Sequence, residues 1–156
     1  MSESLQVLCF QVGERVFAVD IMGIREILRS HVVTPVPNAP AEVAGVVNLR
    51  GQLLPVVNLH QALLHDANAG AREEAKLVVA RAAGRTAGVQ VDQVLEVVSV
   101  DVTELSPVPG SSTGGGGAVV AAFRRELDGR GPVVVLLLRL AILLEKLGID
   151  APGGRP

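Results

Sequence analysis

The stretch VVTPVPNAPAEVAGVVNLRGQLLPVVNL, residues 32–59, decides the fold of this chain. Pro35, Pro37 and Pro40 fix φ and remove backbone donors, so residues 34–41 are expected to form an extended connector. Two apolar runs follow, Val43 to Leu49 and Leu53 to Leu59, on either side of the tight turn Arg50-Gly51-Gln52. Short runs rich in valine and bounded by turn residues predict β-strands.

The same rhythm of short apolar runs and turns continues on both sides of this stretch. Residues 5–12 and 16–20 flank Gly13 and predict a β-hairpin. Further strands are expected at residues 77–81, 86–91, 94–100, 119–123 and 133–138. Apolar residues at helical spacing predict a short helix or helical turn over 21–28 and short helices over 59–64 and 140–147. The fold class is therefore mostly β with a few short helices.

The chain is expected to be one domain over residues 1–156 with an internal boundary. Residues 66–74 are polar, lack hydrophobic periodicity and read as a linker between two similar halves. We expect approximate subdomains at 14–65 and 75–138, with the strand at 5–12 and the helix at 140–147 packing across them. Residues 151–156 are expected to form a flexible tail.

The composition argues against several classes of function. Fourteen basic and sixteen acidic side chains give a net charge of −2 without charge blocks, which is unlike a nucleic-acid-binding protein. The three aromatic residues, Phe10, Phe17 and Phe123, are expected to fill the core. The single cysteine, Cys9, lies in an apolar run and is expected to be buried, which suits the reducing cytoplasm. Neither a signal peptide nor a membrane-inserted segment is expected.

The sequence predicts no cofactor, no metal and no catalytic residues. His31, His60 and His65 do not complete a metal-ligand spacing and are expected to be surface histidines. The stretch from Ser111 to Gly117 lacks the lysine of a phosphate-binding loop and is expected to be a flexible surface loop. No serine lies in a nucleophile elbow, and acidic pairs such as Asp92 with Glu96 are expected to face water.

Three stretches together resemble the CheW-like domain family: FQVGERVFAVDIMGIREIL at 10–28, residues 32–59, and AGVQVDQVLEVV at 87–98. The resemblance implies two small five-stranded SH3-like β-barrels packed side by side. It also implies a non-catalytic cytoplasmic adaptor, associated with membrane-bound receptor arrays. Such an adaptor couples the cytoplasmic tip of a chemoreceptor to the regulatory domain of a CheA-type histidine kinase.

The resemblance also assigns site residues by position. Glu26 and Arg50 match polar recognition residues of the family, and Arg50 in its tight turn suits the charged rim of a receptor groove. The receptor-binding residues implied are Glu26, Asn48, Arg50, Val19, Ile21 and Gly45. Gly45 is expected to serve mainly through its backbone. The resemblance assigns no kinase-binding residues.

Two departures from the family leave alternatives open. Asn58-Leu59-His60 stands where the family often has Asp and Arg, and Arg139 stands where an acidic residue commonly precedes the last helix. These changes would also suit a CheW-like module diverted to gliding or type IV pilus motility that engages one partner only. A barrel that binds a small molecule under a lid formed by residues 111–117 is a third hypothesis.

Overall fold

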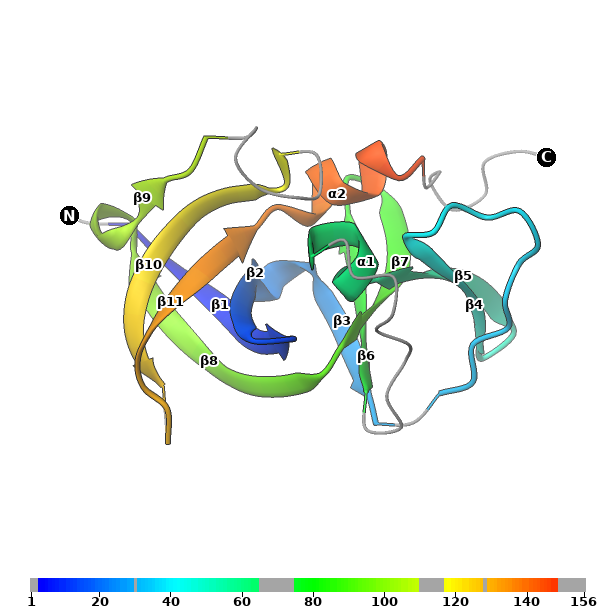
Figure 1. The fold of residues 1–156 in the computed structure, drawn as a ribbon, viewed down its shortest axis with the longest axis horizontal. Coiled ribbons are helices and arrows are strands. Elements are labelled where there is room, and N and C mark those ends of the chain that lie inside the picture. Colours follow the sequence, from blue (N-terminus) through cyan, green and yellow to red (C-terminus); the bar gives the residue numbers. More distant parts are fainter. Residues whose placement is uncertain (1–2, 30, 65–74, 110–116, 128, 149–156) are drawn as a thin grey trace.

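The computed structural model describes residues 3–29, 31–64, 75–109, 117–127 and 129–148. Within these residues the chain forms two sheets and a few short helices (Figure 1). In spatial order, the six-stranded sheet holds β8 (Gln93–Asp101), β1 (Ser4–Val12), β2 (Arg15–Asp20), β11 (Gly131–Leu138), β10 (Val119–Leu127) and β9 (Ser106–Pro107). The five-stranded sheet holds β3 (Ile24–Leu28), β6 (Lys76–Ala82), β7 (Arg85–Val91), β5 (Gln52–Asn58) and β4 (Val43–Leu49).

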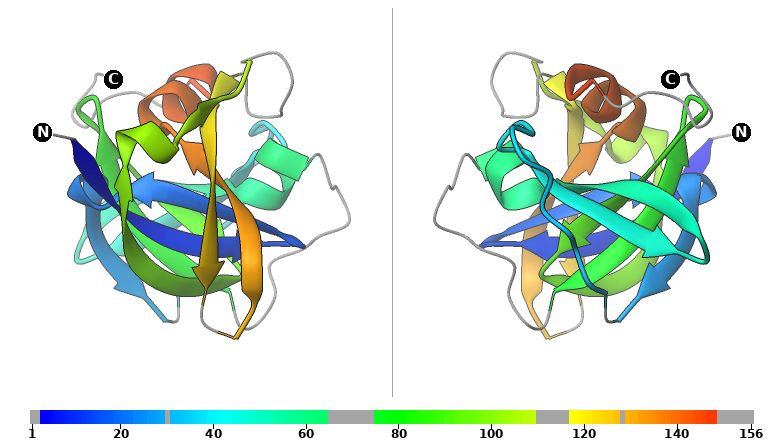
Figure 2. Two further views of the ribbon diagram at one scale, coloured as in Figure 1. Left: turned by 90° about the vertical axis from the view of Figure 1, so that its left-hand side faces the viewer. Right: turned by 90° about the vertical axis from the view of Figure 1, so that its right-hand side faces the viewer.

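The predicted mostly β class with two small sheets is confirmed. The two views of Figure 2 look onto the six-stranded sheet and onto the five-stranded sheet, and each sheet is strongly curved. One sheet has a sixth strand beyond the five expected, the two-residue β9, which pairs with β10 through Ser106 and Pro107.

Both tight hairpins predicted from turn residues are present. Val12 pairs with Arg15 across the turn between β1 and β2, where Gly13 has a φ of 62°. Leu49 pairs with Gln52 across the turn between β4 and β5. Glycine adopts the left-handed conformation without the Cβ clash that other residues meet, so Gly13 suits its turn.

Each sheet takes strands from both sides of residues 66–74. The expected bounds of 14–65 and 75–138 therefore do not follow the sheets. Strand β2 pairs in parallel with β11 of the second half, and β5 pairs in parallel with β7. Parallel partners must be far apart in sequence, so a local pattern does not report them. The predicted linker at 66–74 and tail at 151–156 lie outside the described residues.

The short helix or helical turn predicted over residues 21–28 is present only at its start. A single 3₁₀ turn, η1 (Ile21–Gly23), is followed by strand β3, which pairs antiparallel with β6. The Asp20 side chain caps η1 by accepting a hydrogen bond from the Met22 amide at 2.9 Å. Pairing with a distant strand has overridden the local helical spacing, as β-structure often does.

The two other predicted helices are confirmed. Helix α1 (Leu59–Leu64) follows β5, and α2 (Leu140–Lys146) follows β11. A second 3₁₀ turn, η2 (Val102–Glu104), carries a capping box formed by Asp101 and Glu104. Among the described residues no helix has the length and apolar character that a membrane span requires.

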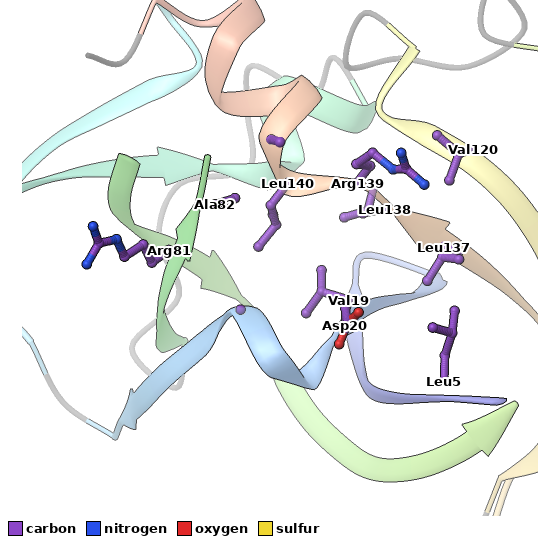
Figure 3. A pocket seen from close by; sticks show the side chains of 12 residues that line it. Leu5, Val19, Asp20, Arg81, Ala82, Val120, Leu137, Leu138, Arg139 and Leu140 are labelled. Carbon is purple, nitrogen blue, oxygen red and sulfur yellow. The ribbon is translucent and has the colours of Figure 1, made fainter. Parts of the chain in front are cut away.

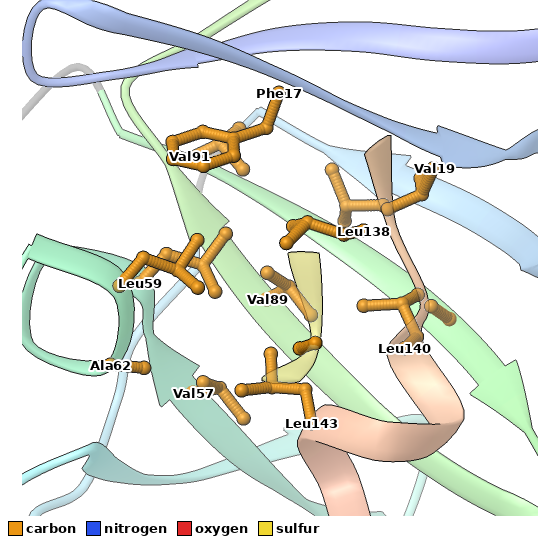
Figure 4. Packing of buried hydrophobic residues seen from close by; sticks show 14 of the residues in the cluster. Phe17, Val19, Val57, Leu59, Ala62, Val89, Val91, Leu138, Leu140 and Leu143 are labelled. Atoms are coloured by element: carbon orange, nitrogen blue, oxygen red, sulfur yellow. The ribbon is translucent and has the colours of Figure 1, made fainter. Parts of the chain in front are cut away.

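Buried apolar side chains form three clusters. One belongs to the six-stranded sheet alone and includes Cys9, Phe123 and Val135, and another belongs to the five-stranded sheet alone and includes Val47, Leu54 and Leu77. The largest joins the two sheets and both α-helices; its members include Phe10, Phe17, Val19, Val57, Leu59, Val89, Val91, Leu138, Leu140 and Leu143 (Figure 4). We call this third cluster the seam core. The predicted burial of all three phenylalanines is confirmed.

Cys9 is fully buried, as predicted, and its surroundings make it unreactive. Burial raises the pKa of the Cys9 thiol to about 11, and the negative charge of Glu96 adds to this effect. Only the thiolate attacks disulfide reagents. We expect Ellman's reagent to leave the native protein unmodified at pH 8 and to label one thiol after unfolding in urea. Rapid labelling of the native protein would contradict this burial.

Candidate functional site

The structure places the six predicted receptor-binding residues in three settings. Glu26, Asn48 and Arg50 form a polar cluster on the five-stranded sheet, which we call the Arg50 cluster. Val19 and Ile21 lie where β2 leaves the six-stranded sheet, and Val19 lines a pocket. Gly45 is buried in β4.

The Arg50 cluster holds a cation in a fixed and exposed position. Arg50 has a φ of 51° in the turn between β4 and β5, and 71% of its side chain is exposed. Its guanidinium donates two hydrogen bonds to the Glu26 carboxylate on β3, one from Nη1 at 3.3 Å and one from Nη2 to Oε2. The Asn48 side chain accepts a hydrogen bond from the Gly51 amide at 2.9 Å and so secures the turn. Two parallel bonds fix a guanidinium plane more firmly than one.

The pair between Arg50 and Glu26 changes the acidity of both groups. Hydrogen bonds from Arg50 hold the pKa of the Glu26 carboxyl below its ordinary value, and those bonds raise the pKa of Arg50. A carboxyl whose pKa is lowered by folding stabilises the fold above its unfolded-state pKa. That contribution is lost as the pH falls through the folded-state pKa.

A carboxyl titration followed by NMR tests this effect. In an Arg50→Gln variant we expect the pKa of Glu26 to rise toward its ordinary value, because the hydrogen bonds and the charge that lower it are gone. The matched control is Arg124→Gln on β10, in the other sheet, which should leave the Glu26 titration unchanged. Equal titrations in the wild type and Arg50→Gln would contradict the pairing.

Gly45 acts through its backbone, because no side chain fits at this position. Its φ is 149°, and a Cβ added there would lie 2.1 Å from the carbonyl oxygen of Thr34. Thr34 and its partner Val46 exchange backbone hydrogen bonds at 2.8 and 2.9 Å, which bring the proline-rich connector against β4. Gly45 therefore allows the connector to pack against β4, an edge strand of the five-stranded sheet.

A pocket of about 290 Å³ opens where the two sheets meet. We call it the seam groove. Its wall is mostly apolar and includes Leu5, Val19, Leu137, Leu138 and Leu140, while Asp20, Arg81 and Arg139 carry the charged side chains around it. Figure 3 shows Val19, Leu138 and Leu140 around one space, with Arg139 extending toward Val120 and Arg81 on the opposite side. Apolar walls with a few charged groups suit a segment of a protein partner.

A part-buried pair of ionisable side chains, His60 with Asp92, was not predicted from the sequence. His60 was expected at the surface but is 7% exposed, and its Nε2 lies 2.9 Å from both oxygens of the Asp92 carboxylate. His31 is half-buried, and burial lowers its pKa. The departure from the family pattern at Asn58-Leu59-His60 was the available signal for this pair. It places an imidazole, which can hydrogen-bond to a carboxylate, in α1 directly after β5.

No group of three or more histidine, cysteine, aspartate or glutamate side chains could hold a metal ion in the part of the chain that the structure describes. His65 lies outside that part, as does the lid predicted at 111–117 except for its last residue, Gly117. The chemistry available at the Arg50 cluster and the seam groove is recognition, because both offer ion pairing and apolar contact.

Comparisons with known proteins agree with this geometry. The family profile described as the CheW-like domain matches residues 6–147. The chain is 32% identical over 127 residues to the chemotaxis protein CheW of Treponema pallidum, covering 80% of this chain and 75% of that protein. It is 38% identical over 105 residues to the chemotaxis protein CheW of Rhizobium meliloti, covering 67% of this chain and 66% of that protein.

A solved structure shares the fold. The scaffolding protein TtCheW of Thermoanaerobacter tengcongensis superposes with a TM-score of 0.78 at 23% identity, over 92% of this chain and 94% of that one. The profile match over residues 6–147, together with the relatives named CheW, shows that this chain belongs to the CheW-like domain family.

Proposed function

We propose that this protein is a non-catalytic adaptor that couples chemoreceptors to a CheA-type histidine kinase. It would bind the cytoplasmic tip of the receptor on one side and the regulatory domain of the kinase on another. It would work in the cytoplasm at membrane-bound receptor arrays. Family membership supports this role, and both candidate surfaces suit binding rather than catalysis.

The observation that carries the proposal is the exposed and preorganised guanidinium of Arg50. A free arginine side chain loses conformational entropy when a partner immobilises it. The left-handed turn and the two bonds to Glu26 have already fixed Arg50, so docking costs less. A charged group held in this way sets the register and the choice of a partner more than the total affinity.

The receptor surface would combine the Arg50 cluster with the seam groove. A receptor tip is helical, and a helix presents an apolar stripe that a groove lined by Val19 and its neighbours can accept. Ile21 follows Asp20, another residue of the groove, and is partly exposed in η1. Gly45 would support this surface only through the backbone of β4, because its own Cα is buried.

A co-assembly experiment with purified fragments tests the proposal. The protein is mixed with a receptor cytoplasmic hairpin and with the kinase regulatory domain from the same organism. Calorimetry at low salt should give dissociation constants of about ten micromolar or tighter for each pair. Size-exclusion chromatography should show one complex that contains all three components.

Two results would contradict the proposal. If neither fragment binds, the protein is not an adaptor of this kind. Binding of one fragment only would remove the coupling role and favour a module diverted to another motility system, which swimming and surface-motility assays of a deletion strain would then separate.

A further inference from the structure

A hydrogen-bonded network closes one end of the seam between the two sheets. At its centre the Asp92 carboxylate contacts Nε2 of His60 on α1 at 2.9 Å and accepts a hydrogen bond from the Gly13 amide at 2.7 Å. The Asp92 amide donates to the carbonyl of Gln11 at 2.9 Å. Asp92 also stands where the chain passes from β7 of one sheet to β8 of the other. Asp92 therefore connects helix α1, which follows β5 of the five-stranded sheet, to the turn of the β1–β2 hairpin.

The network extends further across the six-stranded sheet. The Gln11 side chain donates to the Gly13 carbonyl at 2.8 Å and accepts from Nη2 of Arg130 at 2.7 Å. Arg130 lies in the turn between β10 and β11. The His60 ring also packs over the turn, since a Cβ added to Gly13 would lie 3.6 Å from its Cε1. Both the β1–β2 turn and the β10–β11 turn are thus held at the same end of the molecule.

The seam groove lies at the other end of the β1–β2 and β6–β7 hairpins. In the β1–β2 hairpin, Val12 and Arg15 are at the network end, whereas Val19 and Asp20 line the groove. In the β6–β7 hairpin, Lys76 pairs with Val91 next to Asp92, whereas Arg81 and Ala82 line the groove. The strands span about 20 Å between these ends, at roughly 3.3 Å a residue. The seam core fills the space between them.

We propose that the pair of His60 and Asp92 is a latch that sets the relative placement of the two sheets and, through it, the shape of the seam groove. Apolar contacts in the seam core attract without fixing direction, whereas hydrogen bonds to a carboxylate do fix it. The hairpins pack as stiff units, so a change of angle at the latched end reaches the groove end. His60 is then a positioning residue that acts through Asp92.

Among the described residues, Asp92 is the titratable side chain that contacts His60. Among the described residues β5 has no titratable side chain, and Arg85 begins β7 at the end opposite Asp92. Glu14 and Arg15 follow Gly13 in the turn and are exposed. The latch depends on hydrogen bonds within the folded protein and does not require a binding partner.

NMR of the full chain with three variants tests the latch. His60→Phe keeps a ring over Gly13 and removes Nε2, whereas His60→Gln restores a donor near the same position. Glu104→Gln is the control, because it weakens an ion pair at 3.2 Å between Glu104 of η2 and Arg125 of β10, neither of which belongs to the network around Asp92. Amide exchange is measured at Gly13 and, as a reference for global opening, at the core residue Val78. Methyl shifts of Val19 and Leu137 report on the groove.

In His60→Phe we expect amide exchange at Gly13 to become about tenfold faster, while the exchange rate at Val78 stays unchanged. The groove methyl shifts should move in the same variant. His60→Gln should restore both readouts toward the wild type, and Glu104→Gln should affect neither. Unchanged exchange at Gly13 would overturn the latch, and so would faster exchange with unmoved groove methyls. Because no partner is present, this outcome is independent of the adaptor proposal.

Discussion

Replacing Gly45 by alanine is expected to lower the free energy of unfolding by about 3 kcal/mol. A Cβ there would lie 2.1 Å from the Thr34 carbonyl oxygen and 2.7 Å from its carbonyl carbon. Backbone atoms cannot rotate away as a flexible side chain does, so the connector would have to leave β4. The hydrogen bonds between Thr34 and Val46 would then be lost together with the closure they provide.

The matched control is Gly84→Ala. Gly84 also has a positive φ, 78°, but no atom lies within 4 Å of a Cβ placed on it. Its substitution should cost only the strain of the left-handed backbone, about 1 kcal/mol. Urea unfolding followed by far-ultraviolet circular dichroism measures both. Similar losses in the two variants would show that the contact with Thr34 does not determine the role of Gly45.

Arg50→Glu should weaken binding of the receptor hairpin by about tenfold or more at low salt. The guanidinium proposed to dock the partner would be replaced by a carboxylate, which would face the like charge of Glu26. The fold should survive, because exposed ion pairs contribute little to stability. Calorimetry with the receptor fragment at low and high salt measures the effect, and salt should reduce the difference between the variant and the wild type.

Two further variants make this test specific. Arg124→Glu reverses the same charge on the other sheet and should leave binding within about twofold of the wild type. The exchange Glu26→Arg with Arg50→Glu allows an ion pair to form again with its polarity reversed. If the partner needs a cation at position 50, the exchanged protein still binds weakly. Recovery of binding would instead assign Arg50 to holding β3 against the turn.

The sequence predicted those parts of the fold that neighbouring residues decide. The hairpin turns at Gly13 and at Arg50-Gly51 were predictable because left-handed backbone and flanking apolar runs are local signals. Strand β3 was not, since its apolar residues also fit a helix and only pairing with β6, about fifty residues later, decides between the two. The expected subdomain bounds, 14–65 and 75–138, do not follow the sheets for the same reason.

The candidate site shows the same limit. Family resemblance named Arg50 and Glu26, and the structure brings their side chains together across 24 positions of sequence. The seam groove could not be predicted, because its walls come from both ends and the middle of the chain. His60 was misplaced because the charge that draws it inward, Asp92, lies 32 positions away. Residue types indicate which groups can pair, whereas the topology decides which groups meet.

The parallel pairing of β2 with β11 sets an order of events during synthesis. A ribosome completes the β1–β2 hairpin early, but β8, which flanks β1, ends at Asp101, and β11, which flanks β2, ends at Leu138. The β1 edge of the newborn hairpin therefore carries unpaired backbone groups while about 80 further residues are made, and the β2 edge does so while more than a hundred are made. Unpaired strand edges invite pairing with other chains. The six-stranded sheet can therefore close only after Leu138 has left the exit tunnel, so the first hairpin depends on the last strand of the chain for its own protection.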